Sequence, residues 1–127
     1  MYHYDYCELY AADFASLSES TGMITLIPGT YSISAGIYTR TAIKYTGNLD
    51  FTIALRDSND NLLNINVIRY PVSNTYKAVA GPMLASRLLT CDSNITIGLY
   101  ARCSSNEVGA YVEAGNHDTY LSIIKIN

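Results

Sequence analysis

The stretch that decides the fold is Leu49–Asp57, with the sequence LDFTIALRD. From Leu49 to Leu55, every second side chain is large and apolar. Because successive side chains of a strand point to opposite faces, this spacing predicts a β-strand with one buried face. The polar run Asp57–Asn61 follows, and its Asp, Ser and Asn residues favour a tight turn. Alternation resumes over Leu63–Tyr70, so these pieces predict two strands joined by a turn, with a new loop beginning at Pro71.

The same period of two extends over most of the chain from Met23 onward. Further strands, separated by Gly, Pro, Asn and Asp turns, are predicted at 23–27, 30–39, 76–80, 84–91, 95–101, 108–113 and 120–126. About eight to ten short strands without a long helix are typical of a β-sandwich or barrel. The last strand is strongly apolar, and such a strand is expected in the middle of a sheet. We therefore predict an all-β, antiparallel two-sheet jelly-roll sandwich over residues 23–127, preceded by an N-terminal arm over residues 1–22.

The composition agrees with a single folded domain of 127 residues. Hydrophobic residues make up 49% and charged residues only 15%, against about 25% charged residues in an average domain. Much of the surface is therefore neutral, and such a surface often lies against a partner. Intrinsic disorder is excluded, and no run approaches the roughly 18 apolar residues of a membrane span. The net charge of −3 argues against free nucleic acid as a partner.

The first 22 residues differ from the rest, because they contain four acidic residues and no Lys or Arg. Tyrosines alternate with other residues near the start, which is strand spacing. We interpret this segment as an arm that docks on a basic neighbouring chain. The docking residues are predicted to be Tyr2, Tyr4, Asp5, Tyr6 and Glu8. The alternatives are a solvated acidic terminus and an arm that folds back as a strand of its own sandwich.

Little in the sequence points to catalysis or to a metal. The combination of His117-Asp118 with Glu113 is the one arrangement that suits acid–base or metal chemistry, and a polar loop explains it equally well. Asp57, Asp60 and Asn61 carry oxygens that suit calcium, but turn chemistry accounts for the same residues. We expect no catalytic residue, no metal and no cofactor.

Three cysteines, Cys7, Cys91 and Cys103, form neither a CxxC motif nor an even set. An odd number without metal-ligand spacing predicts buried free thiols rather than a disulfide framework or a zinc site. No signal peptide is visible, since the start is acidic and polar. Synthesis in a reducing compartment is therefore expected.

Two segments resemble a known family. Pro28–Ile37, with the sequence PGTYSISAGI, resembles a strand of complement-component globular heads, and Thr119–Ile126 is similar to the final strand of tumour-necrosis-factor-like head domains. The resemblance covers about residues 23–127 and implies a jelly roll that assembles as a homotrimer, with side chains of one sheet packed around the threefold axis. It matches the terminal-strand tyrosine to Tyr120. Tyr100 is added as a trimer residue because it is expected to point outward from a neighbouring strand.

These observations lead to two hypotheses about function. The first is a non-enzymatic structural protein of a virion, a capsid decoration or cement protein that forms a homotrimer on a bacteriophage capsid. Its partners are then other copies of itself and a major capsid protein, with no nucleic acid and no membrane, and the protein is made in the host cytoplasm. The second is the saccharide- or receptor-binding head of a phage fibre or surface adhesin. The absence of tryptophan weighs against the second, because sugar sites favour that residue.

Overall fold

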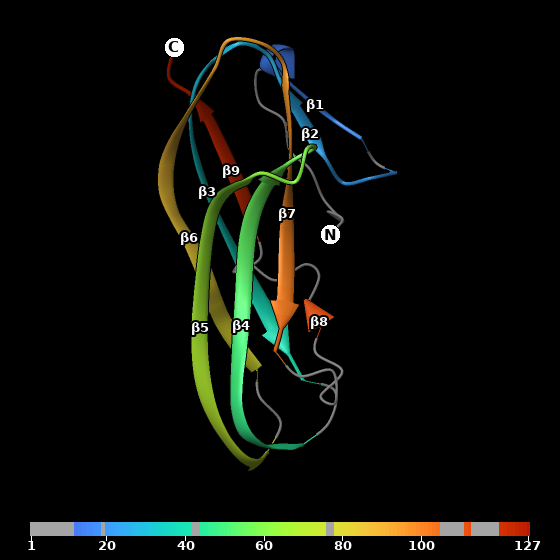
Figure 1. The fold of residues 1–127 in the computed structure, drawn as a ribbon, viewed down its shortest axis with the longest axis vertical. Coiled ribbons are helices and arrows are strands. Elements are labelled where there is room, and N and C mark those ends of the chain that lie inside the picture. The colour runs from blue at the N-terminus through green and yellow to red at the C-terminus, as the bar shows by residue number, and fades with distance from the viewer. Residues whose placement is uncertain (1–11, 19, 42–43, 76–77, 105–110, 113–119) are drawn as a thin grey trace.

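The computed structural model describes residues 12–18, 20–41, 44–75, 78–104, 111–112 and 120–127, which form two antiparallel sheets packed face to face (Figure 1). One 3-10 turn, η1 (Ala12–Phe14), precedes the strands. The strands of this part of the chain are β1 (Ala15–Leu17), β2 (Ile24–Leu26), β3 (Gly29–Arg40), β4 (Tyr45–Asp57), β5 (Leu62–Thr75), β6 (Ala78–Cys91), β7 (Ile95–Cys103), β8 (Tyr111–Val112) and β9 (Tyr120–Lys125). The predicted all-β sandwich is confirmed.

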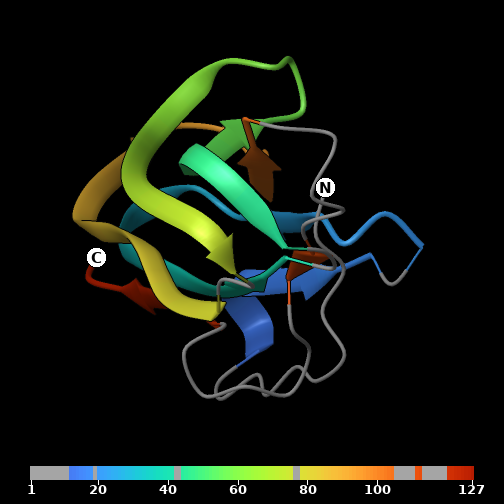
Figure 2. The same cartoon turned by 90° about the horizontal axis from the view of Figure 1, so that it is seen from below.

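The order of the strands defines the topology. Sheet A has the order β1-β2-β7-β4-β5, and sheet B is built on β3, which pairs with β6 on one side and with β8 and β9 on the other. From β2 to β8 the chain changes sheet at every connection except the β4–β5 hairpin. Figure 2 shows the resulting two layers end-on. This repeated crossing between two antiparallel sheets is the winding of a jelly roll.

The core lies between the sheets and has two parts. The larger cluster is centred on Tyr31, Ile53 and Leu99, whose side chains are fully buried. The Tyr31 ring lies 5.8 Å from that of Phe14, and its hydroxyl donates to the carbonyl of Ile27 at 2.7 Å. Burial raises the pKa of Tyr31 above its ordinary value. The inward residues of β3 and β4 thus follow the alternation that predicted these strands.

A second, smaller core cluster lies at the end of sheet A where β4 begins. It consists of Leu49, Phe51 and Val72, and the ring of Tyr70 packs edge-on against Phe51 with the centroids 5.9 Å apart. Val72 lies beyond the predicted end of its strand. The smaller cluster therefore depends on β5 continuing past Pro71.

Two prolines lie inside strands where the sequence predicted loops or gaps. β5 continues through Pro71, which pairs with Asn48, and the predicted strands 76–80 and 84–91 merge into β6 across Gly81-Pro82. β5 and β6 are edge strands among the described strands. In β6, Gly81-Pro82 lies opposite the single residue Ile37 of β3, at a register shift. A proline cannot donate to a ladder, but an edge strand or a bulge needs no donor there. The predicted interruptions were wrong for this reason.

Two features of the chain ends also differ from expectation. β9 has β3 as its partner and no second neighbour among the described strands, so its predicted central position is not seen there. Ala15–Leu17, inside the segment interpreted as an arm, pairs with β2 as part of sheet A. At least these three residues belong to the sandwich.

The facing edges of the two sheets are joined by asparagine side chains. The amide groups of Asn64 and Asn66 on β5 donate to the backbone carbonyls of Ala85 and Met83 on β6, at 3.3 and 2.8 Å. Their carbonyl oxygens accept the backbone N–H groups of the next residues on β5, both at 2.9 Å. Unpaired edge groups invite a foreign strand. Here asparagine side chains form hydrogen bonds with several of these backbone groups.

The contact that Asn64 and Asn66 make between β5 and β6 is called the seam below. We predict that Asn66→Asp weakens the seam and so destabilises the protein. The substitution replaces an N–H donor with a carboxylate oxygen that repels the Met83 carbonyl, and because the bond is exposed the loss is expected to cost about 0.5–1.5 kcal/mol. Urea denaturation of the wild type and the variant measures the difference. Asn94→Asp adds the same charge in the exposed β6–β7 turn and is expected to change stability by less than about 0.5 kcal/mol. Equal stabilities of the two variants would contradict the role of the seam.

Candidate interaction surfaces

The outer face of sheet B carries no charge over most of its length. We call this surface the sheet B face. Its outward side chains come from β6, β3 and β9, in cross-strand register: Met83, Ser86, Leu88 and Thr90, then Thr30, Ser32, Ser34 and Gly36, then Tyr120, Ser122 and Ile124. Every member is neutral. Charged residues are depleted in the core of protein–protein interfaces relative to the rest of the surface, so this composition is unusual for a face left in water.

Apolar side chains form the two margins of the sheet B face. Leu88 and Ile124 are 65% and 60% exposed and pair in register with Ser32 from opposite sides. In the same way Met83 and Tyr120 flank Gly36, and the Tyr120 hydroxyl reaches the Met83 sulfur at 3.9 Å. The small side chains of β3 thus form a floor between two raised margins. The backbones of these margins are two strand spacings apart, or about 10 Å.

Two hydroxyl groups of the floor bond to neighbours on β6. Ser32 pairs with Ser86, and Thr30 pairs with Thr90 at 3.1 Å. A polar group that has a partner within its own sheet can lose contact with water at lower cost than an unpaired one. The sheet B face is therefore chemically suited to dehydration.

The outer face of sheet A is different, because apolar and charged residues are mixed on it. Ile65 of β5 and Tyr100 of β7 lie on either side of Ala54, and the next row places Val67 and Arg102 on either side of Thr52. Ile65 and Val67 are about half exposed. This face offers a small apolar patch next to a guanidinium group.

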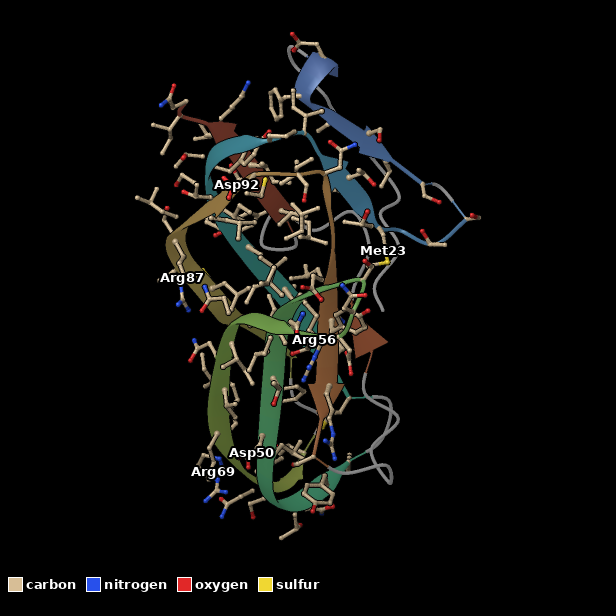
Figure 3. The ribbon with its side chains drawn as sticks, turned by 45° about the horizontal axis from the view of Figure 1, so that its top comes forward. Met23, Asp50, Arg56, Arg69, Arg87 and Asp92 are labelled. Atoms are coloured by element: carbon tan, nitrogen blue, oxygen red, sulfur yellow. The ribbon has the colours of Figure 1, made fainter. Side chains whose placement is uncertain are left out.

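The outer face of sheet A is called the sheet A face below. An ion pair lies at one end of it. Arg69 donates two hydrogen bonds to the carboxylate of Asp50, from Nε at 2.7 Å and from a terminal nitrogen at 3.0 Å, and Figure 3 shows the two side chains close together. These hydrogen bonds lower the pKa of Asp50 and raise that of Arg69. Arg69 is exposed and Asp50 is partly exposed, so the pair orders the surface more than it stabilises the fold.

The carboxylate of Asp57 forms its hydrogen bonds within its own turn, residues 57–61. The Asp57 carboxylate accepts the backbone N–H groups of Asn59 and Asn61, and the Asn61 amide, all at 2.9 Å. The bonds from Asn61 are the main reason that the pKa of Asp57 lies below its ordinary value. Asp60 adopts a φ of 65°, which the turn requires. In the described part of the chain no three His, Cys, Asp or Glu side chains lie close enough together to hold a metal ion.

The other chemistry-bearing residues fall in different places. Cys91 and Cys103 are free, half-buried thiols, and Cys91 lies 3.5 Å from the Ile27 carbonyl. Cys7 and the predicted His117, Asp118 and Glu113 combination lie outside the described residues. Within the described ranges, no helix has the length and apolar character needed to cross a membrane.

The predicted site residues do not come together. Tyr120 points outward from sheet B at 37% exposure, whereas Tyr100 points outward from sheet A and is half-buried. The outer faces of two packed sheets look in opposite directions, so these tyrosines lie on opposite sides of the molecule. The predicted docking residues Tyr2, Tyr4, Asp5, Tyr6 and Glu8 lie outside the described residues.

Sequence reasoning missed the most exposed apolar residues of the sheet B face. Leu88 and Ile124 each stand next to another apolar residue, Leu89 and Ile123, which packs against the core. Two adjacent apolar residues in a strand cannot both point inward. The adjacent apolar pairs Leu88-Leu89 and Ile123-Ile124 were therefore the signal available in the sequence.

No protein-family model matches the chain, and no curated protein matches it either. The resemblance to tumour-necrosis-factor-like and complement head domains therefore stays a prediction.

Proposed function

We propose that this protein is a non-enzymatic assembly protein that forms a homotrimer and decorates the capsid of a bacteriophage virion. The observation that carries the proposal is the pair of opposed outer faces, each with exposed apolar side chains, on one rigid sandwich. A contiguous exposed apolar surface on a folded domain marks a contact with another molecule. Two such surfaces on opposite sides allow a subunit to join a copy of itself and a different partner at once.

The chemistry of the two faces supports binding by burial. Leu88 and Ile124 on one side, and Ile65 and Val67 on the other, offer exposed apolar area. The burial of these apolar side chains in a contact lowers the free energy of the complex. The partner for the second face, in this proposal, is the major capsid protein.

The native mass tests the self-association. Size-exclusion chromatography with light scattering is expected to give about 42 kDa, which is three times the 14.0 kDa of the chain. A mass near 14 kDa at all protein concentrations up to about 1 mM would rule out the homotrimer. This concentration is on the order of the dissociation constant of a weak contact.

The virion role needs a second experiment. Capsid shells assembled from the major capsid protein of the same phage serve as the probe, and the purified trimer is expected to co-sediment with them up to a fixed ratio. The alternative, a saccharide- or receptor-binding head, shares the fold but predicts binding to a glycan array and no binding to shells. Either result on its own decides between the two functions.

A further inference from the structure

We infer that the sheet A face holds an extended, acidic segment of the unlike partner, which places an apolar side chain over Ala54 and a carboxylate on Arg102. This inference rests on the proposed function, which gives this face to the major capsid protein, and it specifies the chemistry that the face recognises. The recognition does not depend on how copies of the chain associate.

The first observation concerns the arginines of this face. Three of them occupy outward positions in the cross-strand register, namely Arg56 of β4, Arg69 of β5 and Arg102 of β7. Arg69 binds the carboxylate of Asp50 through two hydrogen bonds. Arg56 forms an ion pair with Asp60 at 3.6 Å, well apart from Arg69 on the sheet (Figure 3). Arg102 is exposed and has no ion-pair partner within the described part of the chain.

The charge of this face favours an acidic occupant. Its three arginines and the two carboxylates that bind them leave a charge of +1, whereas the whole chain carries −3. A guanidinium group matches a carboxylate with two parallel hydrogen bonds. Two copies packed through this face would instead bring their Arg102 side chains together, and like charges oppose association. Charge complementarity therefore selects an acidic segment over a second copy.

The second observation is a small residue between two large ones, in the row next to Arg102. Ala54 lies between Ile65 on one side and Tyr100 on the other. Its side chain is a single methyl group, and the Ile65 side chain beside it is 47% exposed. An apolar side chain laid over Ala54 contacts a larger side chain on each side and leaves water. This row is therefore suited to an apolar residue of the partner.

The spacing of the rows indicates an extended occupant. The Ala54 row and the row of Val67, Thr52 and Arg102 are two residues apart along each strand, or about 7 Å. In an extended segment the side chains of residues i and i+2 point to the same face and are also about 7 Å apart. A partner segment that runs along the strands can therefore cover Ala54 with an apolar side chain while a carboxylate two residues away reaches Arg102.

A peptide fits these rows better than a saccharide. An acidic sugar also carries a carboxylate, but each of its hydroxyl groups needs a hydrogen-bond partner once water is excluded. In the two rows, hydroxyl groups come only from Thr52 and Tyr100. The backbone N–H and C=O groups of an extended peptide point sideways, parallel to the face, so they are not buried against it. The occupant is therefore assigned as a peptide segment.

The test uses the full-length protein and shells assembled from the major capsid protein of the same phage. Arg102→Glu reverses a charge on the sheet A face, and Arg87→Glu makes the same change at an exposed position of β6 in sheet B. In co-sedimentation at about 0.15 M salt, Arg102→Glu is expected to weaken binding about tenfold or more, and Arg87→Glu less than about twofold. Added salt is expected to weaken binding of the wild type and to strengthen that of Arg102→Glu, because it screens an attraction in the first and a repulsion in the second.

A second pair of variants tests the apolar row. Ile65→Ser removes apolar area beside Ala54, and Ile126→Ser makes the same change beyond the end of β9. The two isoleucines are 47% and 56% exposed, so both variants are expected to fold with unchanged circular dichroism. Ile65→Ser is expected to weaken binding to the shells about tenfold, and Ile126→Ser less than about twofold. Light scattering is expected to give all four variants the mass of the wild type.

The outcomes separate the inference from the proposed function. If the wild type binds the shells and Arg102→Glu binds them equally well, the inference is wrong and the proposed function stands. If Arg102→Glu lowers the mass of the assembly in light scattering, a second copy covers this face and the inference is wrong. If the wild type binds acidic saccharides on a glycan array and does not bind the shells, both the proposed function and the peptide segment assigned to this face are wrong.

Discussion

Tyr31→Ala is expected to lower the free energy of unfolding by about 3–5 kcal/mol, the range for removing a large aromatic side chain from a core. Tyr31 is the largest fully buried side chain of the described residues. Its ring packs against Phe14 and its hydroxyl reaches the Ile27 carbonyl. Because small domains are stable by only about 5–15 kcal/mol, the variant is left close to unfolding. Urea denaturation followed by circular dichroism measures the effect.

Tyr31→Phe is the matched control, since it keeps the ring and removes only the hydroxyl. The Cys91 thiol also approaches the Ile27 carbonyl, so this acceptor retains one weak donor. The expected cost is about 0.5–1.5 kcal/mol, the net value of one hydrogen bond. If the two substitutions cost the same, the stabilisation comes from the hydroxyl and not from ring packing.

Phe51→Ala is expected to cost about 3–5 kcal/mol at the other end of the sandwich. Phe51 is 1% exposed and forms the smaller core cluster with Leu49 and Val72, while Tyr70 covers one side of its ring. The lost ring leaves a cavity that two paired strands on a rigid ladder cannot close. The same urea titration measures it, and Phe51→Leu, which fills most of the volume, is expected to cost about 1 kcal/mol.

The two clusters provide a further check on this prediction. Tyr31 and Phe51 belong to separate clusters with no common member. The costs of the mild substitutions Tyr31→Phe and Phe51→Leu are therefore expected to add within about 0.5 kcal/mol in the double variant. A larger deviation would mean that the clusters act as one core.

Most of the fold was predictable because its signals are local. The alternation in LDFTIALRD is set by the pleat of a single strand, and the Asp57–Asn61 turn is closed by bonds among its own residues. The prolines misled the prediction for a complementary reason. Whether Pro71 or Pro82 interrupts a strand depends on whether that strand lies at an edge, and the edge is defined only by the neighbours that fold beside it.

The candidate surfaces were predictable only in part. The low charge content indicated a neutral surface, and alternation indicated that Tyr100 and Tyr120 point outward. That the two tyrosines lie on opposite sides follows from the assignment of β7 and β9 to different sheets. No pattern within either strand contains that assignment, because it depends on pairing with β4 and with β3.

By itself the sequence determined the class of the fold, because a period of two and short polar turns act over a few residues. Only the tertiary structure decided which member of each apolar pair is buried. Leu89 and Ile123 face Tyr31 and Ile33 across the sheet, and this register leaves Leu88 and Ile124 outside. A shift of one residue would exchange the two sets. Register is set by cross-strand pairing and core packing, and these exist only once distant parts of the chain have met.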